Sequence, residues 1–331
     1  MESLVAVTGA EGFIGSHLVE LLVERGHRVR AMAQYNSFGT WGWLDTLPRD
    51  VLHHVEVILG DVRDPASTHD LIGKAEVVYH LAALIAIPYS YRAPHSYVET
   101  NALGTLNVLE AVRNLGTSRL VHTSTSETYG TARTVPITED HPLQAQSPYA
   151  ASKVAADKLV ESYHLSFELP VVTLRPFNTF GPRQSARAFI PTVVSQIAAG
   201  AEVVSVGALD PTRDFTFVKD TAAAFVAVGT APAAEVVGEL FNAGTGQEIS
   251  MGRLAEEIAG LMGREVVFRS EAARHRPLKS EVMRLVCDSA KLRRRTGWQP
   301  RHILNDGLKH TIEWFLDPAN LNRYRPASYT V

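Results

Sequence analysis

The first half of the chain alternates short apolar segments with longer amphipathic ones. Leu4–Thr8 is an apolar, β-branched run that ends at glycines, which predicts a buried parallel strand. A helix is expected from about Ile14 to Arg25, where Gly26 ends it. Later segments predict strands at Arg28–Ala33, Val55–Leu59, Glu76–Leu81 and Leu120–Thr125, and a helix at Leu103–Leu115. This alternation predicts a doubly wound parallel sheet, an α/β fold of the Rossmann type.

The pattern changes after about Pro176. The later residues carry more prolines, a second glycine-rich turn (AGTGQ, 243–247) and a predicted helix at Met251–Met262. We therefore predict a dinucleotide-binding domain over residues 1–175 and a smaller C-terminal α/β substrate lobe over residues 176–331. Whether some strands of this lobe return to the main sheet is left open.

Composition narrows the class of protein. The chain has 331 residues, of which 45% are hydrophobic and 20% charged, as is usual for a soluble globular protein. The net charge of −3 gives no electrostatic reason to expect nucleic acid or an anionic membrane as a partner. Cys287 is the single cysteine, and the 13 histidines show no metal-binding spacing, so neither a disulfide framework nor a metal site is expected. The N-terminus does not resemble a signal peptide, and we expect a cytoplasmic protein.

A glycine-rich turn follows the first predicted strand. In TGAEGFIG, Gly9, Gly12 and Gly15 lie between that strand and the first helix. Glycines there permit a tight turn and let the backbone approach a pyrophosphate, while the helix N-terminus offers free N–H groups to the negative charge. The turn therefore predicts a dinucleotide site.

The segment after the second strand does not settle which dinucleotide binds. It reads Ala33-Gln34-Tyr35-Asn36, with no acid to reject a 2′-phosphate and no arginine to accept one. Asn36 or Gln34 could bind the ribose, and we expect NAD, with NADP left open. Asp61, after the third strand, could accept a hydrogen bond from the adenine amino group or could cap a helix.

The segment SPYAASK predicts a helix that begins after Ser147. Ser147 suits the N-cap and Pro148 the first helical position, which places Tyr149 and Lys153 four residues apart on one helix face. An ammonium beside a phenol is expected to lower the pKa of Tyr149. Such a tyrosine can exchange a proton with a sugar hydroxyl while a hydride moves to nicotinamide.

With these residues in place, the chain resembles the extended short-chain dehydrogenase/reductase family of NAD-dependent epimerases and dehydratases. The resemblance covers nearly the whole chain, and its motifs occur in the family's order: TGAEGFIG, VVYHLAA (77–83), ETNALGTLNVLEA (99–111), TSTSETYG (123–130), YAASK, RPFNTFGPR (175–183) and TRDFTFVKD (212–220). Members of the family act on nucleoside-diphosphate sugars and usually pair as homodimers through two helices per subunit.

The resemblance also implies roles for individual residues. Thr125 would join Tyr149 and Lys153 and orient the O4 of the sugar. Further cofactor contacts would be Phe13, Ile14, Val62, Leu81, Ala82 and Ala83. Substrate contacts would be Ile85, Asn178, Arg187 and Arg213, with Asn178 and Arg213 on the diphosphate and Arg187 equally compatible with a structural ion pair.

Glu127 indicates the reaction. The carboxyl end of the strand before it should face the ligand, so Ser126 and Glu127 would lie beside the sugar. A 4-epimerase has no task for a carboxylate there. A 4,6-dehydratase needs one, because oxidation at C4 makes the C5 proton acidic and a base must remove it before water leaves from C6. We predict that Glu127 is this base and that Ser126 relays a hydrogen bond.

Comparison within the family favours the same reaction. Ser124–Glu127, STSE, resembles GDP-mannose 4,6-dehydratases, and the stretches 35–45, 82–91 and 184–191 resemble bacterial dehydratases of nucleotide-linked N-acetylhexosamines in legionaminic-acid-type pathways. UDP-glucuronate decarboxylases also carry such a glutamate and are a competing interpretation, with Arg187 or Arg92 available for a substrate carboxylate. The motifs are also compatible with a 4-epimerase and with a non-catalytic dinucleotide-binding redox sensor.

Overall fold

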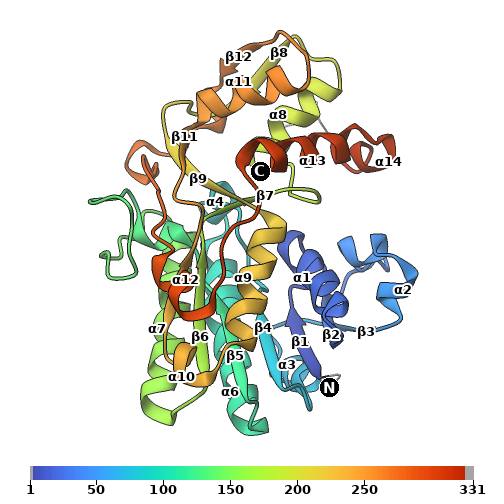
Figure 1. Cartoon of the computed structure of the whole chain (residues 1–331), viewed down its shortest axis with the longest axis vertical. Coiled ribbons are helices and arrows are strands. Elements are labelled where there is room, and N and C mark those ends of the chain that lie inside the picture. Colours follow the sequence, from blue (N-terminus) through green and yellow to red (C-terminus); the bar gives the residue numbers. More distant parts are fainter. Residues whose placement is uncertain (1–2, 325–331) are drawn as a thin grey trace.

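The computed structural model describes residues 3–324 and is built around a parallel sheet of seven strands in the order β10-β6-β5-β4-β1-β2-β3 (Figure 1). The strands are β1 (Leu4–Thr8), β2 (Arg28–Gln34), β3 (Val55–Gly60), β4 (Val77–His80), β5 (Arg119–Thr123), β6 (Val171–Pro176) and β10 (Leu240–Ala243). All neighbouring pairs are parallel. The predicted doubly wound α/β fold is confirmed, and the chain order reverses on the two sides of β1, which pairs with both β2 and β4.

Helices cover both faces of this sheet. One face carries α1 (Phe13–Glu24), α2 (Arg49–Leu52), α9 (Val218–Thr230) and α12 (Ala290–Thr296). The other carries α3 (Pro65–Ile72), α6 (Gly104–Leu115) and α7 (Pro148–Phe167). Leu18 and Phe225 are fully buried in the first layer, and Leu71 and Val108 in the second. The two apolar layers hold the strands rigidly, so that the loops at the carboxyl ends of the strands are well positioned.

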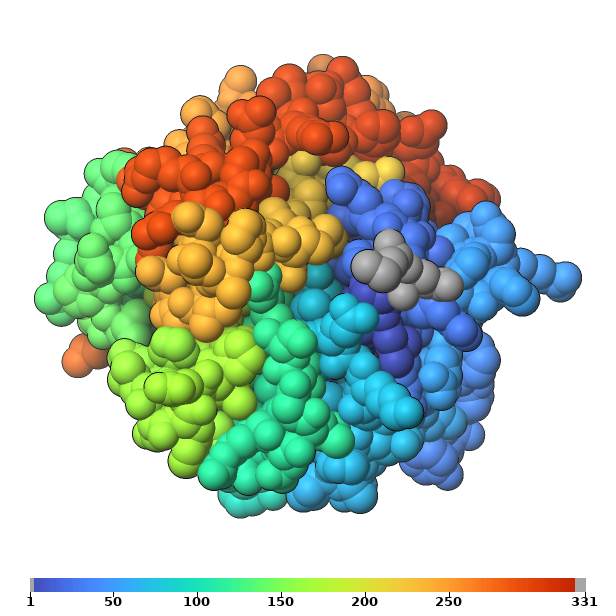
Figure 2. All heavy atoms as spheres, turned by 60° about the horizontal axis from the view of Figure 1, so that its bottom comes forward, coloured from blue at the N-terminus to red at the C-terminus, as the bar shows by residue number. Residues whose placement is uncertain are grey.

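The later half of the chain contributes to this sheet. β10 pairs with β6 in the register Leu240↔Thr173, and the backbone N–H of Gly238 donates to Val171 O at 2.7 Å. In Figure 2 the gold surface of this segment adjoins the lime-green end of α7. Strand β10 therefore belongs to the main sheet, and helices α9 and α12 pack against that sheet. The division of the chain into two domains near residue 175 stays a prediction.

The remaining elements form a lobe above the carboxyl edge of the sheet (Figure 1). It contains a three-stranded sheet in the order β11-β9-β7 and a two-stranded sheet of β12 and β8. Its elements are β7 (Asn178–Phe180), α8 (Phe189–Ala198), β8 (Val203–Val206), β9 (Thr212–Phe217), β11 (Glu248–Ser250), α11 (Met251–Leu261), β12 (Val267–Ser270), α13 (Leu304–Leu316) and α14 (Pro318–Leu321). Val193, Leu254 and Phe315 are fully buried in its separate apolar core.

Local boundaries differ from the predicted ones at two places that matter for the site. A π-helix, η2 (Val98–Leu103), precedes α6, and β5 ends at Thr123, so Thr125 lies in the following loop. Thr125 there caps the 3-10 helix η3 (Ser126–Tyr129). The other short elements are η1 (Gly42–Thr46), α4 (Ile87–Ser90), α5 (Pro94–Tyr97), α10 (Ala233–Val236), η4 (Ala272–Arg274) and η5 (Leu278–Ser280).

Candidate active site

The carboxyl ends of β1, β4 and β5 meet where the strand order reverses. Thr8, the last residue of β1, fixes the geometry of this edge: its Oγ1 accepts hydrogen bonds from the N–H groups of Leu81 at 3.1 Å and Ala82 at 3.0 Å. The turn after β1 is thereby tied to the chain that leaves β4. Because doubly wound folds bind their ligands at such a reversal, this edge is the candidate active site.

Close packing explains two of the glycines in the turn. Gly9 has a φ of +65°, and a Cβ there would lie 2.7 Å from the backbone nitrogen of Ala82. A Cβ on Gly15 would lie 2.1 Å from the carbonyl oxygen of Gly9. Gly12 is the N-cap of α1 and offers no side chain to the free N–H groups of the first turn. The turn therefore fits a pyrophosphate, with Phe13 and Ile14 opening the helix beside it.

We expect Gly15→Ala to destabilise the fold and to remove dinucleotide binding. The added methyl group would clash with backbone atoms, which cannot rotate away, and such overpacking costs roughly 1–3 kcal/mol or more. Urea unfolding and dinucleotide titration measure the two effects. Gly260→Ala is the matched control, because no atom lies within 4 Å of its Cβ position in α11. Equal stability of Gly15→Ala and the wild type would contradict this packing argument.

Other predicted cofactor contacts lie just after the ends of β2 and β3. The Asp61 carboxylate pairs with Arg63 at 2.6 Å, and Val62 is buried beside it. Asp61 does not cap a helix, since Asp64 caps α3. Asn36 uses its amide within its own loop: Nδ2 donates to the carbonyls of Gln34 and Thr40. The ribose contact predicted for Asn36 would therefore have to replace a hydrogen bond of this loop.

Tyr149 and Lys153 lie on one face of α7, as predicted. Ser147 caps the helix, with its Oγ accepting from the Ala150 N–H at 3.1 Å, and Pro148 occupies the first turn. Both Tyr149 and Lys153 are buried. The Lys153 Nζ donates to the Thr123 carbonyl at 2.6 Å, which connects α7 to the end of β5.

The expected lowering of the Tyr149 pKa is wrong. Burial raises the pKa of Tyr149 above its usual value, a hydrogen bond with Thr125 opposes this rise, and the negative charge of Glu127 adds to it. Burial also lowers the pKa of Lys153 to about 8. The ammonium is directed at the Thr123 carbonyl, and desolvation outweighs its attraction for a phenolate.

A buried carboxylate stands behind the lysine. Asp157, one turn further along α7, accepts hydrogen bonds from Arg175 Nη2 at 2.6 Å, Ser124 Oγ at 2.7 Å and His122 Nε2 at 3.1 Å. Burial lowers the pKa of Lys153, Asp157 opposes that effect and Arg175 adds to it. Asp157 therefore helps to keep the lysine protonated, and through Ser124 it fixes the start of the loop that carries Thr125 and Glu127.

Glu127 is buried in the loop after β5. Its backbone N–H donates to Thr125 Oγ1 at 3.3 Å, and only 9% of the residue is exposed. Its negative charge acts on the phenol of Tyr149. The structure therefore brings Thr125, Glu127, Tyr149 and Lys153 into one site. Ser126 is buried in the same loop.

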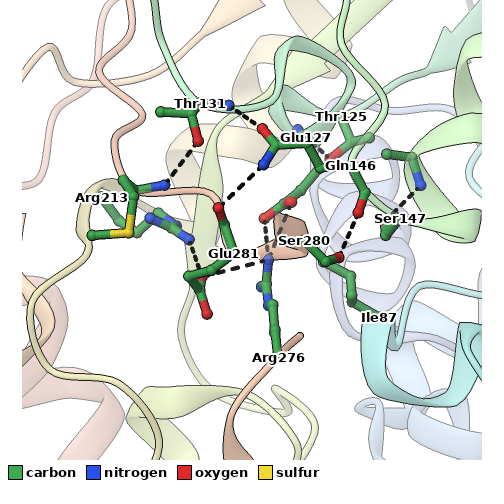
Figure 3. Close-up of polar contacts among 12 residues, drawn as sticks. Ile87, Thr125, Glu127, Thr131, Gln146, Ser147, Arg213, Arg276, Ser280 and Glu281 are labelled. Atoms are coloured by element: carbon green, nitrogen blue, oxygen red, sulfur yellow. Dashed lines mark hydrogen bonds and ion pairs between the residues drawn. The ribbon is translucent and has the colours of Figure 1, made fainter. Parts of the chain in front are cut away.

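A cluster of charges joins Glu127 to the C-terminal lobe (Figure 3). Arg276 Nη1 lies 3.3 Å from Glu127 Oε2 and 3.9 Å from Glu281 Oε1, and Arg213 Nη2 lies 3.4 Å from the same Glu281 oxygen. Burial alone would lower the pKa of Arg276, but Glu127 and Glu281 more than reverse this, and its pKa lies above the usual value. Sequence reasoning missed Arg276 and Glu281, because their loop has neither a periodic pattern nor a motif.

The predicted substrate contacts occupy different environments. Asn178 starts β7, and its buried Oδ1 has no hydrogen-bond partner. Arg213 on β9 is buried, which lowers its pKa, while Glu127 and then Glu281 oppose that effect. Arg187 and Ile85 are exposed on loops. Asn178 and Arg213 are thus the two of these four with buried polar atoms, and Asn178 Oδ1 lacks a partner whereas Arg213 donates to Thr212 and Glu281.

Residues 3–324 offer neither a metal site nor a membrane span. No group of three or more His, Cys, Asp or Glu side chains in this part of the chain is arranged to hold a metal ion. No helix within it is long and apolar enough to cross a membrane.

Comparison with known proteins identifies the family. A model of the family described as GDP-mannose 4,6 dehydratase matches residues 6–311. The chain belongs to this family. Its extended short-chain dehydrogenase/reductase character, inferred above from the motifs, is confirmed.

Curated relatives of the family carry several activities. A UDP-glucose 4-epimerase from Mycolicibacterium smegmatis is 36% identical over 93% of this chain and 97% of its own length. A dTDP-glucose 4,6-dehydratase from Xanthomonas campestris pv. campestris is 31% identical over 94% and 92%. A UDP-N-acetyl-alpha-D-glucosaminuronate decarboxylase from Bacillus cytotoxicus is 30% identical over 97% and 100%. The chain is therefore a nucleotide-sugar-modifying enzyme of this family, and these relatives leave its specific reaction open.

Solved structures support the cofactor. A dTDP-glucose 4,6-dehydratase from Streptomyces venezuelae with bound NAD has a TM-score of 0.83 and 27% identity, covering 98% of this chain and 99% of that one. A UDP-glucose 4-epimerase from Thermus thermophilus in complex with NAD has a TM-score of 0.83 and 28% identity, covering 95% and 99%. Both agree with the NAD expected from the sequence.

Proposed function

We propose that the chain is an NAD-dependent nucleoside-diphosphate-sugar 4,6-dehydratase that acts on an N-acetylhexosamine and produces a 4-keto-6-deoxy sugar. The observation that carries this proposal is the buried carboxylate of Glu127 beside Thr125 and Tyr149. Burying a carboxylate costs free energy, so a role for it is expected. A 4-epimerase oxidises C4 and returns the hydride to C4, and that reaction leaves no proton for Glu127 to remove.

Each residue has a separate part in this reaction. Thr125 orients the C4 hydroxyl, and Tyr149 accepts its proton as a phenolate, the form that the positive charge of an oxidised nicotinamide would favour against the effect of burial. The turn from Gly9 to Gly15 would hold NAD, whose chemistry there would be to accept the C4 hydride and to supply it again at C6. Glu127 removes the C5 proton, and the C6 hydroxyl leaves as water with a proton from Glu127. C5 then regains a proton from solvent, so the overall change is loss of one water molecule.

The diphosphate is proposed to lie under the lobe. Arg213 offers a planar pair of donors that suits phosphate oxygens; its Nη1 donates to the Thr212 carbonyl at 2.9 Å, and its Nη2 lies 3.4 Å from Glu281 Oε1. Asn178 lies on the neighbouring strand of the same small sheet. We also propose the homodimer through α6 and α7 that the family resemblance implies, since Leu165 at the end of α7 is 75% exposed.

Incubation with a panel of nucleotide sugars in heavy water tests the proposal. The expected product carries deuterium at C5 and a new C6 methyl group, both visible by NMR. A C4-epimerised sugar without deuterium at C5 would instead indicate an epimerase. Dinucleotide binding without turnover on any member of the panel would indicate a redox sensor.

Arg276 favours decarboxylation as the second candidate. A decarboxylase must bind the C5 carboxylate of a nucleotide uronate, and the guanidinium of Arg276 lies beside Glu127 where such a group would arrive. The panel therefore includes two nucleotide uronates. Release of carbon dioxide from either, together with its loss in Arg276→Gln, would favour the decarboxylase over the dehydratase.

A further inference from the structure

The end of β2 lacks the acid that dinucleotide sites of this fold usually have. In such sites an acidic residue at this place accepts a hydrogen bond from the 2′-hydroxyl of the adenosine ribose and rejects a 2′-phosphate. Here β2 ends at Gln34, after the fully buried Ala33. The ribose would therefore meet no carboxylate from β2 itself.

A carboxylate reaches this place from another element. Glu11 lies in the glycine-rich turn between β1 and α1, and its Oε1 accepts the backbone N–H of Gln34 at 3.2 Å. The carbonyl of Glu11 accepts the Trp43 N–H at 3.0 Å, and the loop around Gly42 packs against its side chain. These contacts hold the carboxylate at the end of β2, directly beside the pyrophosphate turn.

The second oxygen of this carboxylate is left without a donor. Glu11 Oε2 is buried and has no hydrogen-bond partner, and no salt bridge reaches Glu11 among residues 3–324. Burial raises the pKa of Glu11, and two backbone N–H groups oppose this only in part. A buried carboxylate oxygen without a donor is unfavourable, and a ligand hydroxyl that donates to it would remove that cost.

We propose that Glu11 substitutes for the missing acid of β2, binds a hydroxyl of the adenosine ribose of NAD and excludes the 2′-phosphate of NADP. The inference rests on the dinucleotide site of the proposed function and adds the residue that selects between the two cofactors. A 2′-phosphate carries about two negative charges. It would place them next to the Glu11 carboxylate, which already lacks a hydrogen-bond donor for Oε2.

The other polar groups nearby are already engaged. Asp61 is paired with Arg63, so the guanidinium of Arg63 already donates to a carboxylate instead of to a 2′-phosphate. The Asn36 side chain is held within its own loop by the carbonyls of Gln34 and Thr40. Glu11 is therefore the carboxylate at this edge that combines a fixed position with an unused oxygen.

Binding measurements on cofactor-free protein test the proposal. We expect Glu11→Gln to weaken NAD binding and to strengthen NADP binding, each by about 10- to 100-fold, because one hydrogen bond to a charged group is lost and one repulsion is removed. Dissociation constants for NAD and NADP are measured by calorimetry for the wild type and the variant. Glu24→Gln, an exposed acid at the end of α1, is the control and should bind both dinucleotides as the wild type does.

The outcomes separate this inference from the proposed function. If the wild type prefers NAD and Glu11→Gln loses the preference while its thermal unfolding midpoint is kept, the inference holds. If Glu11→Gln and a second variant, Glu11→Ala, both keep the full preference for NAD, the inference is wrong and the dinucleotide site stands. If the wild type binds neither dinucleotide, the proposed function fails first.

Discussion

Glu127→Gln is expected to slow formation of the C6 methyl group by about 10²–10⁴-fold while the bound cofactor is still reduced by the sugar. The amide has nearly the shape of the carboxylate but cannot take the C5 proton. Tyr149 and Lys153 are unchanged, so oxidation at C4 should continue and the reaction should stop at the 4-keto sugar. Loss of a positioned base costs about 10²–10⁴-fold in rate.

Two signals measured on one sample resolve this block. Absorbance of the reduced nicotinamide follows C4 oxidation, and NMR in heavy water follows deuterium at C5 and the methyl group. In the variant the first signal should rise and persist, while the second should be about 10²–10⁴-fold slower.

Glu281→Gln is the matched control for loss of charge in the cluster of Figure 3. Glu281 contacts the same Arg276 and also Arg213. The dissociation constant of this variant for the nucleotide sugar should therefore change. It should nevertheless keep the wild-type ratio of methyl formation to cofactor reduction. Normal methyl formation by Glu127→Gln, or an equal block in both variants, would show that Glu127 is not the base.

Lys153→Met is expected to lower turnover by about 10²–10⁴-fold and, at pH 7, to stabilise the cofactor-free protein. The ammonium is buried and anchors the Thr123 carbonyl at the site. A methionine of similar length removes a desolvated charge and fills the same space. The proposed reaction requires this ammonium, which would account for a group that destabilises the fold.

The sign of the stability effect follows from the pKa of Lys153. This pKa is about 8 in the folded chain against an ordinary value of 10.5, so the unfolded chain binds more protons between these two values. The free energy of unfolding of the wild type therefore increases as the pH rises from about 8 to 10.5. Below about pH 8 the full destabilisation caused by burying the charged lysine is present. The full shift corresponds to at most about 3 kcal/mol, and loss of the bond to Thr123 would offset about 1 kcal/mol of the gain in the variant.

Urea unfolding of both proteins at several pH values measures this difference directly. The stability advantage of Lys153→Met should be largest below pH 8 and should shrink at higher pH. Lys158→Met is the control, since Lys158 is exposed on the same helix and pairs with Glu161 at 2.5 Å. If the difference in unfolding free energy between the two proteins were constant across the pH range, burial of the charged Lys153 would not destabilise the fold.

The sequence predicted the parts of the site that depend on neighbouring residues. The order of strands and helices, the turn from Gly9 to Gly15 and the helix capped by Ser147 all occur as expected. Tyr149 and Lys153 share a face because four residues span about one helical turn, which holds for any such helix. Glu127 was placed correctly at the carboxyl edge, since a parallel sheet brings its strand ends together.

The partners of these residues could not be predicted. Arg276 contacts Glu127 across 149 positions of sequence, and nothing in either segment indicates the other. The burial that raises the pKa of Tyr149 and lowers that of Lys153 is likewise a property of the packed structure. Local spacing predicted that these two groups would face the same way, but not that water would be excluded from both.

By itself the sequence determined the alternating fold, the glycine-rich turn after β1 and the shared helix face of Tyr149 and Lys153, because each depends on backbone preferences and spacings within a few residues. The tertiary structure decided which charges meet: Arg276 with Glu127, Asp157 with Arg175, and Glu11 with the end of β2. Those pairs depend on how two sheet faces and a lobe pack, and the energy of a charge depends on its neighbours in space and on its distance from water.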